Sequence, residues 1–463
     1  MCNLPKRSVM TLLLALSLTF TPVLAAANSS PVRLDRDPVF QITPLTDSPL
    51  IVANERLTFE VGSSSSEAMV TASYQLINPS NTRLDIPLIF PAVSEGEPLF
   101  RPRITLDGQE LDYELFLAGS ASVMDYFDNP QGFAQQVNVA SILSALNQPL
   151  YQPQSFRPGD QAVLYEVTLG GQINRQSTIE FEFDPEKTKV VSLFHQGYFG
   201  SKTTAGSQVK FSRHVDEMTL GEKMAVLVIG DDDLTGLAVS SGDSLSKRTV
   251  TVDQYLREVL FASDTEWRDL DKRNTDNFYS AILQELDASW VENVSSFSAA
   301  RPLDDVVNNV LYQSNISAFL FTAAFAPDST TELTVSYPVR ATIDRSTSTD
   351  FVNTFAYILS PAGNFADFGT LDIEIRLNQH SPYVLESSIP LQTDGTGKYT
   401  ASLQGLPEVD LVFSTYTRPQ ITALDSLRAN SSYPVLILII GAAFLLAITA
   451  LLMLMRRLSG SAQ

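Results

Sequence analysis

Three consecutive aspartates form the densest group of potential metal ligands in the sequence. Asp231, Asp232 and Asp233 directly follow the apolar run 226–230, which is typical of a buried strand. Carboxylate oxygens are ligands that Ca²⁺ prefers in proteins. The alternating ligand spacing of a calcium-binding loop is missing, however, and aspartate is also favoured in solvated turns. We therefore expect a turn, with a Ca²⁺ site as the alternative, and we expect no other cofactor.

Other groups that could carry chemistry are sparse. The three histidines, His195, His214 and His380, are far apart in sequence, and none has the spacing of a metal-binding motif. The segment Gly119–Ser122 lacks the closing glycine of a nucleophile elbow. The single cysteine, Cys2, lies ahead of an N-terminal apolar run that we expect to be removed. The sequence therefore predicts no specific catalytic residue.

Paired carboxylates are the remaining route to catalysis. A glycosidase needs only two carboxyl groups, held about 5 to 9.5 Å apart. The chain contains 52 acidic residues, and no local pattern brings a particular pair together. We therefore favour a protein that is not an enzyme, and we keep a hydrolase acting on polysaccharide as the alternative.

The charge of the chain is concentrated between its two ends. Of 31 basic residues, Lys6, Arg7, Arg456 and Arg457 lie outside residues 28–432, whereas all 52 acidic residues lie inside that stretch. So acidic a stretch argues against binding nucleic acid, which requires a basic surface. The stretch also contains no cysteine, and the absence of disulfides favours a bacterial over a eukaryotic exported protein.

The N-terminal residues predict export. Lys6 and Arg7 precede the apolar run 9–20, and small residues follow at 23–27. A short basic region, a short apolar run and small residues at the end are the parts of a secretory signal peptide. We assign residues 1–27 to it.

The C-terminal residues predict a membrane anchor. Residues 435–455 carry no charge. At about 1.5 Å per residue, a helix of this length matches the roughly 30 Å hydrocarbon core of a bilayer. We place the transmembrane helix and its basic stop at 433–457, and a cytoplasmic tail at 458–463. The expected protein is a single-pass cell-membrane protein with its N-terminal bulk extracellular and its C-terminus cytoplasmic.

Most of the stretch between these ends has the pattern of β-strands. Residues 67–77 and 83–90 are rich in β-favouring side chains, and the turn residues between them predict a pair of strands. Pro87 indicates that the second strand lies at a sheet edge. Asp107–Gly108 separates two alternating runs and predicts a tight hairpin.

Helical spacing of apolar residues interrupts the β pattern in 133–146, 251–290 and 304–311. We predict a mainly β fold of immunoglobulin-like β-sandwich modules with helical insertions, followed by the transmembrane helix. The predicted parts are a β-rich extracellular domain at 28–250 with a helical insertion near 120–148, a helical region at 251–311, a second β-rich domain at 312–414 and a stalk at 415–432.

Two pairs of segments resemble a known class of proteins. They are Tyr74–Ser80 with Leu88–Pro91, and Phe355–Ala362 with Phe368–Ile375. Their order resembles that of uncharacterised surface proteins of Gram-positive bacteria. The resemblance implies an exported β-rich protein with a signal peptide and a C-terminal transmembrane anchor. It implies no activity and no functional residue.

These features favour a non-enzymatic binding or interaction module at the cell surface. The expected partners are the lipid bilayer through residues 435–455, and a cell-wall polymer or another membrane protein. One alternative is a membrane-tethered hydrolase acting on polysaccharide through paired carboxylates. Another alternative is an accessory or sensory subunit of a membrane complex, since the cytoplasmic tail is too short to signal alone.

Overall fold

The computed structural model describes the greater part of residues 33–425. The described residues are 33–34, 39–94, 101–120, 139–168, 177–193, 198–203, 209–215, 223–261, 274–291, 300–312, 315–346, 348, 350–423 and 425, with 441, 445, 448 and 449. They fall into two compact units, the larger formed by residues 35–342 and 353–419. In the smaller unit, Arg33–Leu34 (β1) pairs antiparallel with Ile343 and Asp344 of β21 (Thr342–Asp344).

The predicted signal peptide and anchor lie outside the described residues, apart from four isolated positions near the C-terminus. Among the residues that are described, no helix is both long and apolar enough to cross a bilayer.

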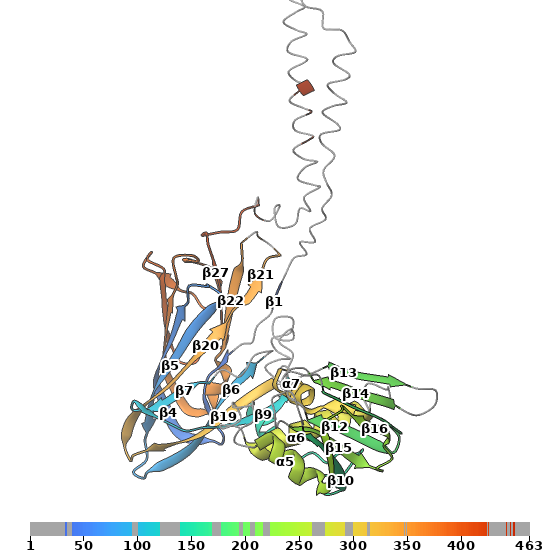
Figure 1. The fold of residues 1–463 in the computed structure, drawn as a ribbon. Coiled ribbons are helices and arrows are strands. Elements are labelled where there is room, and N and C mark those ends of the chain that lie inside the picture. The colour runs from blue at the N-terminus through green and yellow to red at the C-terminus, as the bar shows by residue number, and fades with distance from the viewer. Residues whose placement is uncertain are drawn as a thin grey trace, which may run out of the picture. The chain divides into compact units, whose positions relative to one another are not determined.

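Two sheets pack against each other in the larger unit (Figure 1). In hydrogen-bonding order, the first sheet contains β25 (Gln392–Thr393), β26 (Lys398–Gln404), β23 (Phe365–Arg376), β4 (Ser48–Val61), β5 (Glu67–Asn78), β20 (Ser329–Arg340), β7 (Arg103–Leu106) and β8 (Gln109–Glu110). The second contains β22 (Val352–Ile358), β2 (Val39–Phe40), β6 (Leu84–Ser94), β19 (Asn315–Phe325) and β9 (Glu114–Ser120), with β3 (Thr43–Pro44) beside β6, and β27 (Leu411–Tyr416) between β22 and β24 (Tyr383–Ser387).

Alternation along each strand builds the core between these sheets. In β5, Val70, Ala72, Tyr74 and Leu76 are buried, while most of the residues between them are less buried. Successive side chains on a strand point to opposite faces, so one face of β5 enters the core. The mainly β fold is therefore confirmed.

The predicted Asp107–Gly108 hairpin is confirmed. Asp107 and Gly108 both have positive φ values, 47° and 79°, and they connect β7 to β8. A two-residue hairpin loop of type I′ requires positive φ at both central residues.

The predicted pairing of residues 67–77 with 83–90 is wrong. β5 pairs with β4 and β20, whereas β6 pairs with β19, β2 and β3 in the opposite sheet. The side chain of Asn78, at the end of β5, holds the connection that leads from the first sheet to β6 in the second. Its Oδ1 accepts from Ser80 N at 3.0 Å, and its Nδ2 donates to Ala326 O at 2.8 Å. The prediction that Pro87 lies on an edge strand is also wrong, because β6 lies between β3 and β19. The missing N–H of Pro87 is tolerated because β3 spans only two residues, which pair with Leu88 and Ile89.

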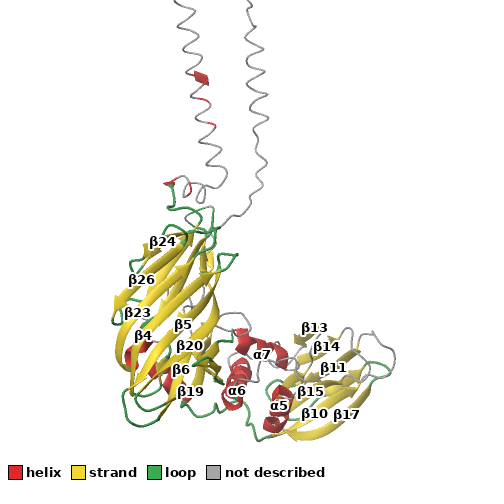
Figure 2. Cartoon of the chain, turned by 90° about the vertical axis from the view of Figure 1, so that its left-hand side faces the viewer, coloured by secondary structure: helices red, strands yellow, loops and turns green. Residues whose placement is uncertain are grey.

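Residues 139–312 are inserted between β9 and β19 and form three layers (Figure 2). The middle sheet contains β17 (Ser244–Thr251), β10 (Gln161–Thr168), β15 (Lys223–Gly230), β12 (Thr188–Leu193) and β18 (Ala300–Pro302). A smaller sheet contains β13 (Tyr198–Thr203), β14 (Val209–Val215), β11 (Ser177–Phe183) and β16 (Thr235–Val239). The helical layer contains α5 (Val252–Phe261), α6 (Thr275–Val291) and α7 (Leu303–Tyr312), whereas α4 (Val139–Leu146) packs against β9 of the sandwich.

The central strand β15 is buried on both faces. Leu227 and Ile229 pack in the cluster that contains α5, α6 and α7, while Val226 and Val228 pack against the smaller sheet. This explains why residues 226–230 read as an unbroken apolar run.

Segments distant in sequence share the sheets of the sandwich. β20 pairs with β5, and β23 pairs with β4. Residues 315–416 therefore complete the sheets begun by residues 48–118. The helices within 251–312 cover one face of the inserted sheet, so residues 251–311 share a core with residues 156–229, whereas residues 312–414 share a core with residues 42–115.

Candidate functional site

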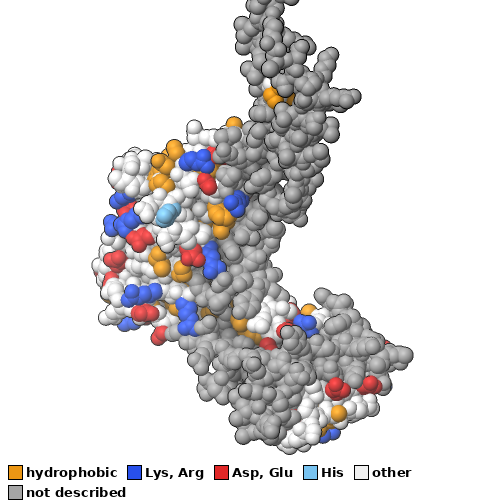
Figure 3. Space-filling view, turned by 45° about the horizontal axis from the view of Figure 1, so that its top comes forward, with side chains coloured by type: hydrophobic (Ala, Val, Ile, Leu, Met, Phe, Trp, Pro, Cys, Tyr) orange, Lys and Arg blue, Asp and Glu red, His pale blue; other side chains and the backbone are white. Residues whose placement is uncertain are grey.

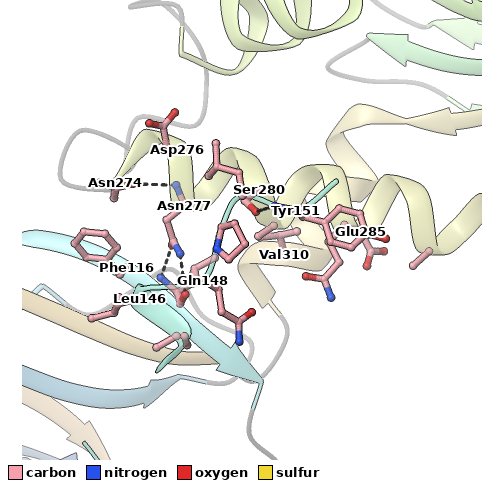
Figure 4. Close-up of a pocket in the computed structure, with 18 residues that line it drawn as sticks. Phe116, Leu146, Gln148, Tyr151, Asn274, Asp276, Asn277, Ser280, Glu285 and Val310 are labelled. Carbon is pink, nitrogen blue, oxygen red and sulfur yellow. Dashed lines mark hydrogen bonds between the residues drawn. The ribbon is translucent and has the colours of Figure 1, made fainter. Parts of the chain in front are cut away.

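A groove of about 780 Å³ lies where the inserted segment meets strand β9 (Figure 4). One wall is formed by residues 116–118 of β9, and a second by the end of α4 with residues 148–151. The third wall is one side of α6, with Val310 of α7 beside it. Small-molecule sites in proteins commonly have volumes of about 300 to 1,000 Å³.

Asn274 fixes the start of α6. Its Oδ1 accepts from Asn277 N at 2.9 Å, which is an N-cap hydrogen bond. Its backbone N donates to Leu115 O at 2.8 Å, and its Nδ2 donates to Glu114 Oε1 at 2.8 Å. The helix therefore starts against β9.

Asn277 covers the edge of β9 (Figure 4). Its Oδ1 accepts from Leu117 N at 2.7 Å and its Nδ2 donates to Leu117 O at 3.0 Å, as a neighbouring strand would. Since β9 ends the order of its sheet, this amide satisfies backbone groups that would otherwise need another partner.

Asp287 holds the loop that forms the second wall. Its side chain is fully buried and accepts hydrogen bonds from Tyr151 Oη at 2.7 Å, Gln154 N at 2.7 Å, Ser155 N at 2.8 Å and Ser155 Oγ at 2.5 Å. Tyr151 N also donates to Ser280 Oγ at 2.7 Å. Two turns of α6 therefore hold this loop in place.

These contacts shift two pKa values. Burial raises the pKa of Asp287, but the hydrogen bonds from Gln154, Ser155 and Tyr151 outweigh burial and hold that pKa below its ordinary value. The same hydrogen bond raises the pKa of Tyr151 to about 12. Asp287 is thus an ionised structural acceptor.

Polar side chains with free hydrogen-bonding capacity face the groove. Gln148 and Gln284 are exposed, and their side-chain amides have no partner among the described residues. The charged residues of the described lining are both acidic. Asp276 pairs with Arg257 at 2.9 Å, and Glu285 pairs with Arg301 at 3.3 Å and accepts from Asn309 Nδ2 at 2.7 Å. The described lining therefore suits a polar ligand that is uncharged or cationic.

The two acidic side chains of the lining are badly placed for glycoside hydrolysis. Asp276 and Glu285 are nine residues apart on α6, which corresponds to about 13.5 Å along the axis and two and a half turns. They therefore lie on opposite flanks of the helix. A glycosidase pair must lie about 5 to 9.5 Å apart across one bond.

The predicted aspartate cluster lies in the connection between β15 and β16. Asp232 Oδ1 accepts from Tyr165 Oη at 2.8 Å and its Oδ2 pairs with Lys247. Asp233 Oδ1 accepts from Thr188 Oγ1 at 2.8 Å, and Asp231 N donates to Lys187 O at 3.2 Å. Within the described part of the chain, no group of three or more His, Cys, Asp or Glu side chains is arranged to hold a metal ion.

Of the other predicted groups, the structure describes the side chain of His380, which is not part of the groove lining. His380 is exposed in a turn, where its N donates to Asn378 Oδ1 at 2.7 Å. The side chains of His195 and His214 lie outside the described residues, as does the end of Gly119–Ser122.

Comparisons with known proteins identify no family. No family model matches the sequence, and no curated protein matches it. Among solved structures, the chain is distantly similar to a Legionella pneumophila protein described as a candidate nutrient binding protein, with 9% identity and a TM-score of 0.36. That match covers 87% of this chain and 76% of the other. So distant a likeness carries no inference about activity.

Proposed function

We propose that the protein is a non-enzymatic binding module whose groove between β9 and α6 takes a polar ligand, either uncharged or cationic. The observation that carries this proposal is a groove of about 780 Å³ whose walls are fixed by Asn277 and Asp287. At its surface, the side-chain amides of Gln148 and Gln284 have no hydrogen-bond partner in the part of the chain that the structure describes. Fixed walls with a few free polar groups are typical of ligand sites. A segment of cell-wall polymer or a small polar molecule fits this description.

Among the described residues, the face in Figure 3 shows no large patch of one charge. On the face displayed in Figure 3, acidic and basic side chains are interspersed, and neither sign forms a continuous area. A binding role at the groove therefore rests on shape and hydrogen bonding.

Substitution of the unpaired amides tests the proposal. Gln284→Leu and Gln148→Leu should each lower affinity about tenfold, because a ligand group that loses its buried hydrogen bond costs about 1 to 3 kcal/mol. Binding of neutral and amine-bearing glycans and of cell-wall fragments would be measured by calorimetry with the full chain. Gln404→Leu on β26 is the matched control, since this exposed glutamine lies away from the groove.

Two results would contradict the proposal. One is that no member of the panel binds. The other is that Gln284→Leu and Gln404→Leu bind equally well. Release of soluble fragments from wall polymer by the wild-type chain would instead favour the hydrolase.

We further propose that residues 435–455 anchor this module at the outer face of a membrane. The support is the uncharged stretch followed by Arg456 and Arg457. Protease added to intact spheroplasts should digest residues 28–432, while a cytosolic marker protein survives. Survival of both until the cells are lysed would place the bulk inside and refute this topology.

A further inference from the structure

A buried polar cluster lies between the two sheets of the sandwich, away from the groove. Its centre is the carboxyl of Glu55 on β4, which is fully buried. Tyr357 Oη on β22 donates to Glu55 Oε1 at 3.3 Å, and Gln41 Nε2 donates to Glu55 Oε2. Tyr74 Oη on β5 lies 3.1 Å from Tyr357 Oη. The cluster therefore links strands of both sheets.

A change of strand phase puts Glu55 in the core. The β4 ladder with β5 shifts between Val52 and Asn54, so that an extra residue, Ala53, bulges out. Leu50 and Val52 face inward before this shift, and Leu57 and Phe59 face inward after it. Glu55 shares the second phase, so its side chain enters the core.

No cation neutralises this carboxyl within the described core. The titratable neighbours are Tyr74 on β5, Tyr337 on β20 and Tyr357 on β22, all buried. The buried residues that the facing strands contribute to this core carry no charge: Ser317 on β19 and Thr415 on β27 are polar, and the others are apolar, namely Leu88, Phe90 and Ala92 on β6, Phe319, Phe321, Ala323 and Phe325 on β19, and Leu411 and Phe413 on β27. Burying a charge without an opposite charge is costly, so burial raises the pKa of Glu55 to about 8 despite the hydrogen bonds that lower it.

The neutral acid fits the cluster. Tyrosine hydroxyls both donate and accept, so a protonated carboxyl keeps its partners by reversing one hydrogen bond. Gln41 offers a further acceptor to the protonated carboxyl. Its Oε1 is buried and has no partner among the described residues, and the Nε2 of the same amide already contacts Glu55. The proton therefore removes the charge without breaking the cluster.

We propose that the Glu55 carboxyl is a proton-controlled latch between the two sheets, closed when the acid is neutral and loosened when it ionises. In the unfolded chain this carboxyl ionises near 4.5, the ordinary value, whereas in the folded chain it ionises near 8. The stabilisation is therefore complete below about pH 4.5 and declines as pH rises, until it is lost above about pH 8. Within this window, each pH unit should change the unfolding equilibrium constant about tenfold through this group.

Unfolding of the full chain, followed from about pH 5 to pH 9, tests the latch. The difference between wild type and Glu55→Gln isolates the contribution of this group, because the amide is neutral throughout. Glu55→Gln should lack the tenfold change per pH unit and should be the more stable protein above about pH 8. Glu60→Gln is the matched control, since Glu60 lies on the same strand and is exposed, so it should keep the wild-type pH slope.

A pH slope in Glu55→Gln equal to that of wild type would overturn the latch. If Glu55→Gln does not fold, the infrared spectrum of the wild-type chain decides. A protonated-carboxyl band present near pH 6 and absent near pH 9 supports the latch, and its absence at both pH values overturns it. Tyr357→Phe removes a donor to the ionised form, so it should move the loss of this band to higher pH.

Discussion

Asp287→Asn should lower the free energy of unfolding by about 3 kcal/mol, although it hardly changes the size of the side chain. Each oxygen of Asp287 accepts two hydrogen bonds, and all four donors belong to the loop at 151–155. In Asp287→Asn, an NH₂ group replaces one of these oxygens. Whichever oxygen it replaces, the NH₂ group faces two hydrogen-bond donors, so these donors lose their acceptor. Denaturant unfolding of the full chain near pH 7 would measure the loss, and affinity at the groove should fall because the second wall is released.

The stability that Asp287 contributes should decrease in acid. The pKa of Asp287 is lowered in the folded chain, so its contribution is present above the ordinary value of 3.8 and is lost as pH falls through the lower folded value. The deficit of Asp287→Asn should therefore shrink in acid. Asp276→Asn, on the same helix but exposed, should cost less than about 1 kcal/mol. Equal losses in the two variants would mean that Asp287 does not fasten the loop.

Local signals in the sequence predict the elements but not their partners. Asp107–Gly108 marks its own hairpin because the required backbone angles belong to two adjacent residues. The helices within 251–290 and 304–311 likewise follow from spacing along one segment. Strand pairing is different, since β5 would satisfy its alternating pattern against many strands. Its partner β20 lies more than 240 residues later in the chain.

The groove is hidden in the sequence for a similar reason. Its walls come from residues near 117, 148 and 280, and no local motif connects them. The spacing of Asn274 and Asn277 is the one local signal, because a cap residue bonds the amide three positions later. The burial of Glu55, in contrast, can be predicted from the sequence. The buried apolar residues of β4 occupy even positions up to Val52 and odd positions from Leu57, and this change indicates a bulge that turns Glu55 inward.

Phe59→Ala should cost about 4 kcal/mol of stability, because it removes a fully buried ring that contacts three others. The Phe59 ring centroid lies 5.1 Å from that of Phe413 and 6.2 Å from those of Phe355 and Tyr357, in edge-to-face geometry. Thermal and denaturant unfolding would measure the loss. Phe351→Ala is the control and should cost less than about 1 kcal/mol, since that residue is 48% exposed.

The cavity left by Phe59→Ala also reaches the latch through Tyr357. Water that enters beside Tyr357 would solvate the ionised Glu55, so the pKa of Glu55 should fall toward its ordinary value and the pH slope of stability should weaken above it. A core that merely lost packing would become less stable by the same amount at every pH. The pH dependence of the Phe59→Ala deficit therefore separates lost packing from hydration of the carboxyl, and a constant deficit would show that water does not reach Glu55.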